Sequence, residues 1–276
     1  MSARRKSTKA LLDRDPQREA LYSLLEVGAA LQFKKLPSFP FFSASNLNES
    51  ITNIHFSWFL EPLKKMKPHE RSLFLPLFPM QTQTQIKKFV DFSITPIQTA
   101  RFLHPYLQNY LIDQIQKNRP PRSLLEQTEL SVLLTISTEN LLSLLDYLGI
   151  LDLAAQLSQI VDRTLLSTIY QSLKPSQLKF LHYASKQSMI YAPKKLDLTH
   201  LSKDKGKLNK LLHRRGLARL AGAISDEKDE FQWHLLHKLD TGRAAVIEKT
   251  KDTELTKELI QSFRKDVVNL AKRVTR

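Results

Sequence analysis

Leucine-rich segments with helical spacing, separated by prolines, follow one another along most of this 276-residue chain. After Ser137, for example, Leu141, Leu144, Leu145 and Leu148 recur at intervals of three and four residues, which places them on one face of a helix. Only six glycines are present, whereas a sheet protein needs more turn glycines and more β-branched runs. We therefore expect an all-α fold built from stacked short helices.

The absence of cysteine excludes several kinds of chemistry. Disulfides, thiolate metal sites and cysteine nucleophiles all require a residue that this chain lacks. No apolar run approaches the roughly 18 to 20 residues that a membrane span needs, and residues 1–9 are basic without the hydrophobic core of a secretory signal. We expect a cytoplasmic protein that other molecules recruit.

Basic side chains exceed acidic ones by a wide margin. Forty-two lysines and arginines against 27 acidic residues give a formal net charge of +15. Such an excess favours an anionic partner, which can be nucleic acid, an anionic membrane face or an acidic protein surface.

Breaks in the helical pattern divide the chain into five regions. The sharpest break is the KNRPPR segment at residues 117–122, and a second, lysine-rich bridge follows residue 190. The expected regions are a basic arm with a short helix (1–45), an N-terminal helical domain (46–120), a middle armadillo-like domain (121–190), a linker (191–207) and a C-terminal helical domain (208–276).

Two Lys-Pro pairs suggest a faint internal repeat. Pro68 and Pro175 each follow a lysine and precede an amphipathic segment, so proline is expected at the first position of both helices. Stacked helical repeats would produce this pattern, and two unrelated helix starts would produce it as well. A further helix is expected to begin at Ser123, where SLLE has the spacing of a capping box.

The densest cationic segment lies between residues 203 and 219. On a helix, Lys207, Lys210, Arg214 and Arg215 would share one broad face, and Arg219 follows one turn later. Such a stripe can bind phosphates, meet an acidic protein, or form a solvated or intramolecular face. No aromatic residue is interleaved with it, which argues against single-stranded nucleic acid.

Motifs for catalysis or metal binding are missing. His234 and His237 have a spacing that can hold a metal, with Glu230 one turn before them, but no third strong ligand follows. They are better explained as residues at a helix interface beside Trp233. Because phosphate-loop, dinucleotide and nucleophile-elbow signatures are also absent, we expect no cofactor and no enzymatic activity.

Three segments near the C-terminus resemble a known family. They are LARLAGAIS at 217–225, KLDTGRAA at 238–245, and the stretch from Glu258 to the VNLAKR run at 268–273. Their order is similar to the C-terminal domain of the flagellar motor switch protein FliG, in which Arg243 matches the arginine of an R-A-A motif. The resemblance implies helical modules that stack on neighbouring proteins.

The chain departs from that family at its charged positions. Ala221 stands where the family has a lysine. The two positions that are acidic in the family, after the R-A-A motif, are occupied here by Thr250 and Lys251, and the E-H-P-Q motif of the family's middle domain is absent. The resemblance therefore implies a retained scaffold without the charges that transmit torque. Such a chain would suit a non-enzymatic adapter of a type III secretion or flagellar-type basal body, located at the cytoplasmic face of the inner membrane.

The expected partners of this adapter are an inner-membrane ring protein and cytoplasmic platform proteins. Self-association of the chain is a further alternative. Two alternatives remain: a helical nucleic-acid-binding protein that uses the basic stripe, and a secretion chaperone or effector whose N-terminal arm is an export signal. The candidate partner-binding residues are Lys207, Lys210, Arg214, Arg215, Arg219, Trp233 and Arg243.

Overall fold

The structure, a computed structural model, describes residues 51–92, 103–115, 122–186, 196–198, 205–251 and 255–275. Every regular element within these ranges is a helix, which confirms the all-α prediction. The arm predicted at residues 1–45 lies outside the described residues, and so does most of the linker predicted at 191–207.

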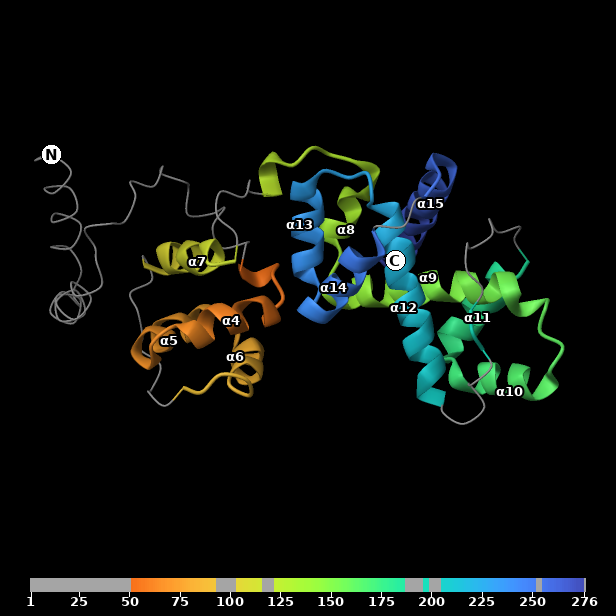
Figure 1. Ribbon diagram of the computed structural model, residues 1–276, viewed down its shortest axis with the longest axis horizontal. Helices are drawn as coiled ribbons and strands as arrows, with labels where there is room; N and C mark the ends of the chain where they lie inside the picture. Colours follow the sequence, from red (N-terminus) through yellow and green to blue (C-terminus); the bar gives the residue numbers. More distant parts are fainter. Residues whose placement is uncertain are drawn as a thin grey trace, which may run out of the picture.

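The described helices form two parts along one long axis (Figure 1). The N-terminal lobe, formed by residues 51–92 and 103–115, lies at one end, and the helical body, formed by the described residues from 122 to 275, makes up the rest. The lobe contains α4 (Ser57–Lys65), α5 (Pro68–Phe74), the 3₁₀ turn η2 (Leu75–Leu77), α6 (Met80–Ile86) and α7 (His104–Asp113). The body contains the 3₁₀ turns η4 (Arg122–Leu124) and η5 (Glu129–Ser131), then α8 (Val132–Thr135), α9 (Thr138–Leu157), α10 (Arg163–Ser172), α11 (Pro175–Ala184), α12 (Lys205–Ala223), α13 (Asp229–Lys238), α14 (Thr241–Thr250) and α15 (Lys257–Val274).

The N-terminal lobe has a hydrophobic core of its own. Phe59 and Leu63 of α4 are fully buried against Leu111 and Ile112 of α7, and Ile86 of α6 closes the cluster. Since these residues come from three short helices, the lobe is held together by side-chain burial more than by the length of any helix.

Both Lys-Pro pairs begin helices as predicted. The backbone N–H of Lys67 donates to Glu70 at 3.0 Å at the start of α5, and that of Lys174 donates to Gln177 at 3.0 Å at the start of α11. In each case proline occupies the first helical position, where its missing N–H costs nothing.

The helix predicted to begin at Ser123 does not form beyond a single 3₁₀ turn, η4. Thr128 then adopts an extended conformation, with φ −115° and ψ 169°, and begins a second short turn. A capping signal starts a helix, but continuation needs further helical residues, and the extended threonine interrupts them.

Helix α9 is the central element of the body. It begins after Ser137, whose side chain accepts from the Asn140 N–H at 3.1 Å, as the sequence indicated. Its length and apolar composition are those of a possible membrane span, although no such run was expected from the sequence. Here α9 packs against α11, α12 and α15, and most of it is buried by these helices, which is the arrangement expected of a helix that is apolar on all sides.

Two glycines allow α9 and α12 to touch where they cross (Figure 1). A Cβ atom on Gly149 of α9 would lie 2.0 Å from the carbonyl oxygen of Leu212. One on Gly216 of α12 would lie 1.8 Å from the carbonyl oxygen of Leu145. The two backbones are therefore in direct contact, and neither position has room for a side chain.

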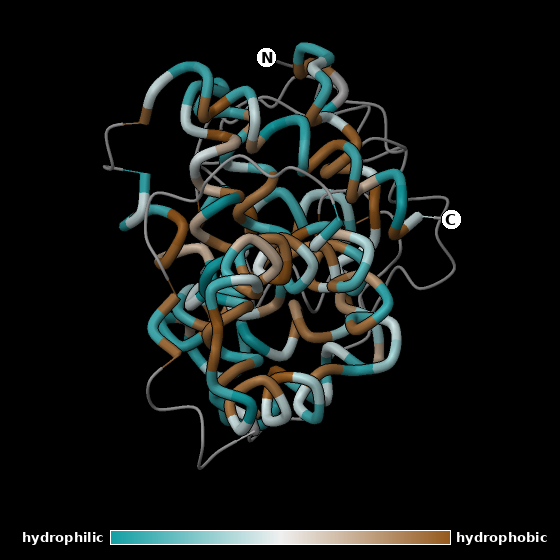
Figure 2. The backbone as a smooth tube through the Cα atoms, turned by 90° about the vertical axis from the view of Figure 1, so that its right-hand side faces the viewer, coloured by the Kyte–Doolittle hydropathy of each residue, from teal (hydrophilic) through white to brown (hydrophobic). Residues whose placement is uncertain are grey.

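The regions predicted as separate middle and C-terminal domains share one hydrophobic core. Leu144 of α9, Phe180 of α11, Leu220 of α12 and Val267 of α15 all belong to one buried cluster. Figure 2, viewed along the long axis, shows many apolar segments gathered in the middle of the outline. The two regions pack together through α9, which contacts α11 of the first region and α12 and α15 of the second.

A buried lysine ties α13 to α8. The ammonium of Lys238 donates to the carbonyl oxygens of Leu133, Leu134 and Ile136 at 3.0, 2.9 and 2.5 Å. These carbonyls lie at the C-terminal end of α8, where a positive charge is favourable. Burial, with a smaller contribution from the positive charge of Arg122, lowers the pKa of Lys238 to about 8.

Candidate partner-binding groove

Helix α12 carries two classes of basic side chain. Lys207, Lys210 and Arg214 are exposed, and their side chains make no hydrogen bond or ion pair with any residue that the structure describes. Arg219 is buried and Arg215 is partly buried. The stripe predicted from the sequence therefore divides into an outward group of three and an inward pair.

The inward pair belongs to a charged network inside the body. Asp152 of α9, only 1% exposed, accepts from the Nε of Arg215 and from the Nε of Arg219, each at 2.5 Å. Arg219 also donates from Nη1 to Asp266 of α15 at 2.8 Å, and its guanidinium lies 5.0 Å from the ring centre of Phe263. The expectation that these two arginines face a partner is thus corrected. Both pair with the buried Asp152 and so tie α12 to α9, and Arg219 also ties α12 to α15.

The outward group borders a shallow groove between α12 and α14. Lys210 and Arg214 line it from α12, and Arg243 lines it from α14. The partly exposed Val246 contributes apolar surface to the groove, buried Leu217 lies beneath it, and the volume of the groove is about 420 Å³. Three of the seven residues predicted as partner-binding therefore meet here. Lys207 lies about one turn before Lys210, towards the N-terminus of α12.

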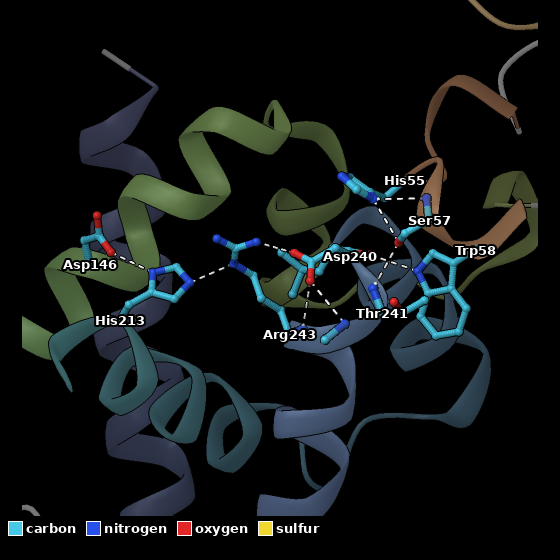
Figure 3. Close-up of polar contacts among 10 residues, drawn as sticks. His55, Ser57, Trp58, Asp146, His213, Asp240, Thr241 and Arg243 are labelled. Carbon is cyan, nitrogen blue, oxygen red and sulfur yellow. Dashed lines mark hydrogen bonds and ion pairs between the residues drawn. The ribbon is translucent and has the colours of Figure 1, made fainter. Parts of the chain in front are cut away.

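A chain of hydrogen bonds begins at one wall of this groove (Figure 3). Asp146 of α9 lies 2.7 Å from the Nδ1 of His213, and the Nε of Arg243 lies 2.8 Å from the Nε2 of the same ring. Because an arginine Nε can only donate, His213 must accept at Nε2 and carry its proton on Nδ1, which it donates to Asp146.

The chain continues through Arg243 to Asp240. Besides the ion pair with Arg243, this carboxylate accepts from the backbone N–H groups of Gly242 and Arg243, each at 3.1 Å, and so caps the N-terminus of α14. Burial alone would raise the pKa of Asp240, but the hydrogen bonds and positive charge of Arg243 outweigh it and lower that pKa. The guanidinium is thereby held in place beside the groove.

The residues next to Asp240 join the helical body to the N-terminal lobe (Figure 3). The contacts are polar and use backbone atoms, so they fix the orientation of one part against the other. The backbone N–H of His55 donates to the His237 carbonyl at 2.7 Å, the Nε1 of Trp58 donates to the Leu239 carbonyl at 2.9 Å, and the Thr241 N–H donates to the Ser57 hydroxyl at 3.1 Å.

Both tryptophans of the chain lie at this junction. The ring of His237 is stacked between Trp58 and Trp233, with 3.9 Å between ring centres on each side. Trp233, predicted to bind a partner, thus packs against the lobe of its own chain. His234 meets Trp233 edge-on at 5.0 Å, and the described residues contain no group of three or more histidine, cysteine, aspartate or glutamate side chains able to hold a metal.

No sequence pattern gave Asp146, His213 or Asp240 a role in a site. The Asp-Thr-Gly-Arg order at 240–243 was a usable signal for Asp240, because aspartate is a preferred helix cap. Nothing in the sequence pairs Asp146 with His213, since 67 residues separate them.

Comparisons with protein-family models, with curated proteins and with solved structures find no match for this chain.

Proposed function

We propose that this chain is a non-enzymatic structural adapter that binds another protein through the groove between α12 and α14. One observation carries this proposal: Lys207, Lys210 and Arg214 of α12 are exposed and form no ion pair with any residue that the structure describes, and two of them line the groove, whereas Arg215 and Arg219 on the same helix are used internally. A protein interface typically combines an apolar centre with a polar rim, and the groove has both parts.

The rigidity of the body around the groove also supports an adapter. The crossing of α9 and α12 leaves no space at Gly149 and Gly216, and the network around Asp152 fixes α15 to the same pair of helices. A surface that is already ordered loses little conformational entropy when a partner binds.

The apparatus that we propose for this adapter is a type III secretion or flagellar-type basal body, in which it would link the inner-membrane ring to the cytoplasmic platform. The support for this more specific proposal is the resemblance of residues 217–225 and 238–245 to the flagellar switch family. In the structure the first segment lies at the end of α12 and the second runs from the end of α13 into α14, and they contribute Leu217 and Arg243 to the groove lining.

Affinity purification of the tagged full-length chain from its native cells tests this proposal. The extract is treated with nuclease and washed at about 0.3 M salt, because nucleic-acid contacts weaken steeply with salt, and the bound proteins are identified by mass spectrometry. Recovery of ring, platform or secretion-ATPase components is expected. Recovery of nucleic-acid proteins alone, or loss of all binding on nuclease treatment, would instead support a nucleic-acid-binding role.

A further inference from the structure

The exposed cations of α12 are spaced for a helical partner. Lys207, Lys210 and Arg214 lie at positions i, i+3 and i+7, on one side of α12 over about 10 Å. Arg243 of α14 faces them across the groove. Acidic side chains at i, i+3 or i+4, and i+7 of another helix have the same periodicity and can therefore approach all three cations from one face.

The apolar part of the groove matches the remainder of such a helix. Val246 is partly exposed in the groove lining, and Leu217, 3% exposed, forms part of the core beneath it. An amphipathic helix whose acidic residues flank leucine or valine would cover Val246 while it pairs the charges. Apolar anchors in a groove are a recurring way in which proteins recognise helices.

Phosphates fit this groove less well than carboxylate-bearing helices. Asp146 lines the groove and Asp240 is bound to Arg243, so a polyanion would approach two negative charges together with the cations. The lining also contains no phenylalanine, tyrosine or tryptophan on which a base could stack. A helix can place a few carboxylates opposite Lys207, Lys210 and Arg214 and keep uncharged side chains opposite Asp146 and Asp240, whereas a nucleic acid carries a charge at every phosphate.

We propose that the groove between α12 and α14 binds an acidic amphipathic helix of a partner protein. Its carboxylates meet Lys207, Lys210 and Arg214, and its apolar side chains contact Val246. This inference rests on the proposed function in one respect, namely that the partner is a protein. It adds that the segment of the partner that binds is helical, acidic and amphipathic.

The first part of the test maps what touches the groove. A photo-crosslinking amino acid replaces Asn209, an exposed residue of the groove lining, in the full-length chain expressed in native cells. A matched variant carries it at the exposed Gln261 on α15. Crosslinks from position 209, absent from position 261, are expected to fall on a segment with acidic residues at helical spacing. Crosslinks to nucleic acid, to a non-acidic segment, or at the same frequency from both positions would overturn the inference.

The second part measures whether the charges act as stated. A synthetic peptide of the crosslinked segment is titrated against the purified full-length chain and against the variant Lys210→Glu/Arg214→Glu. The control is Lys257→Glu/Lys265→Glu, the same charge change at exposed sites of α15. We expect at least a roughly tenfold loss of affinity for the groove variant and less than a twofold loss for the control. A peptide with two acidic residues changed to lysine should regain affinity for the groove variant.

Equal losses in both variants would show that only net charge matters, and would overturn the proposed site. The two proposals can also fail separately. If apparatus components crosslink to the chain only at positions other than 209, the proposed adapter function would stand and the groove would be rejected as the binding site. If the crosslinked acidic helix belongs to a protein outside such an apparatus, the groove would stand as the binding site and the secretion or flagellar assignment would be rejected.

Discussion

Replacing Gly216 by alanine should destabilise the protein, because the new Cβ atom would lie 1.8 Å from the carbonyl oxygen of Leu145. A carbon and a carbonyl oxygen normally approach no closer than about 3.3 Å, so α9 and α12 must move apart locally by about 1.5 Å. Both obstructing groups are backbone, and no change of side-chain rotamer can relieve the contact. Gly149→Ala produces the same conflict from the opposite helix, against Leu212.

The expected cost follows from two opposing effects. Overpacking a rigid contact costs about 1–3 kcal/mol and occasionally more, and the backbone-to-backbone clash places Gly216→Ala at the upper end. Alanine is a better helix former than glycine and returns up to about 1 kcal/mol. The free energy of unfolding should therefore fall by about 2–3 kcal/mol, which lowers the Tm by roughly 4–12 °C at the 2–4 °C per kcal/mol typical of larger domains.

Urea and thermal unfolding followed by circular dichroism measure this change. The control is Gly206→Ala, at an exposed position in the first turn of the same helix, and its stability should stay within about 0.5 kcal/mol of wild type. The double variant Gly149→Ala/Gly216→Ala should cost less than the sum of the single variants, because one separation of the helices accommodates both methyl groups. A Gly216→Ala variant as stable as wild type would refute the close crossing.

Three further changes test other contacts of the helical body. Asp152→Asn should lower the free energy of unfolding by about 3 kcal/mol or more, because Arg215 and the buried Arg219 lose their charge partner; urea denaturation measures it, and apolar replacement of all three residues should recover most of the loss. The pKa of Lys238, about 8, lies below its unfolded value, so the unfolded chain binds more protons between pH 8 and about 10.5. The free energy of unfolding should therefore rise with pH in that window by up to about 1.4 kcal/mol per unit relative to Lys238→Met, and identical pH dependence of the two proteins would contradict the burial of the ammonium. Asp240→Ala should cost about 1 kcal/mol in thermal unfolding through loss of the α14 cap, whereas an unchanged Tm would show that the cap is dispensable.

The helical class and several helix starts could be predicted because local signals determine them. Ser137 at the N-cap of α9 and proline at the first position of α5 and α11 act within one turn of the chain. The structure differs from the local prediction at Ser123, where a capping sequence produced only one turn.

The charged site was only partly predictable, because its arrangement depends on distant residues. Helical spacing grouped Lys207, Lys210 and Arg214 correctly, but Arg215 and Arg219 face inward because a carboxylate 63 and 67 residues earlier lies across from them. Asp152 stands alone in the apolar segment LGILDLA at 148–154. A lone carboxylate in such a segment requires a buried cation, and that requirement was the available signal for an internal role of the two arginines.

The stacking of His237 between the chain's two tryptophans has a consequence for measurement. Trp58 belongs to the N-terminal lobe and Trp233 to the helical body, and the chain has no other indole. The tryptophan fluorescence of the protein, excited selectively beyond the tyrosine absorption, therefore originates at the one place where its two parts meet. This emission will report separation of lobe and body, whereas local opening of α10 and α11, at the far end of the long axis (Figure 1), will leave it unchanged. The protein thus carries a built-in optical probe of the junction between its two parts.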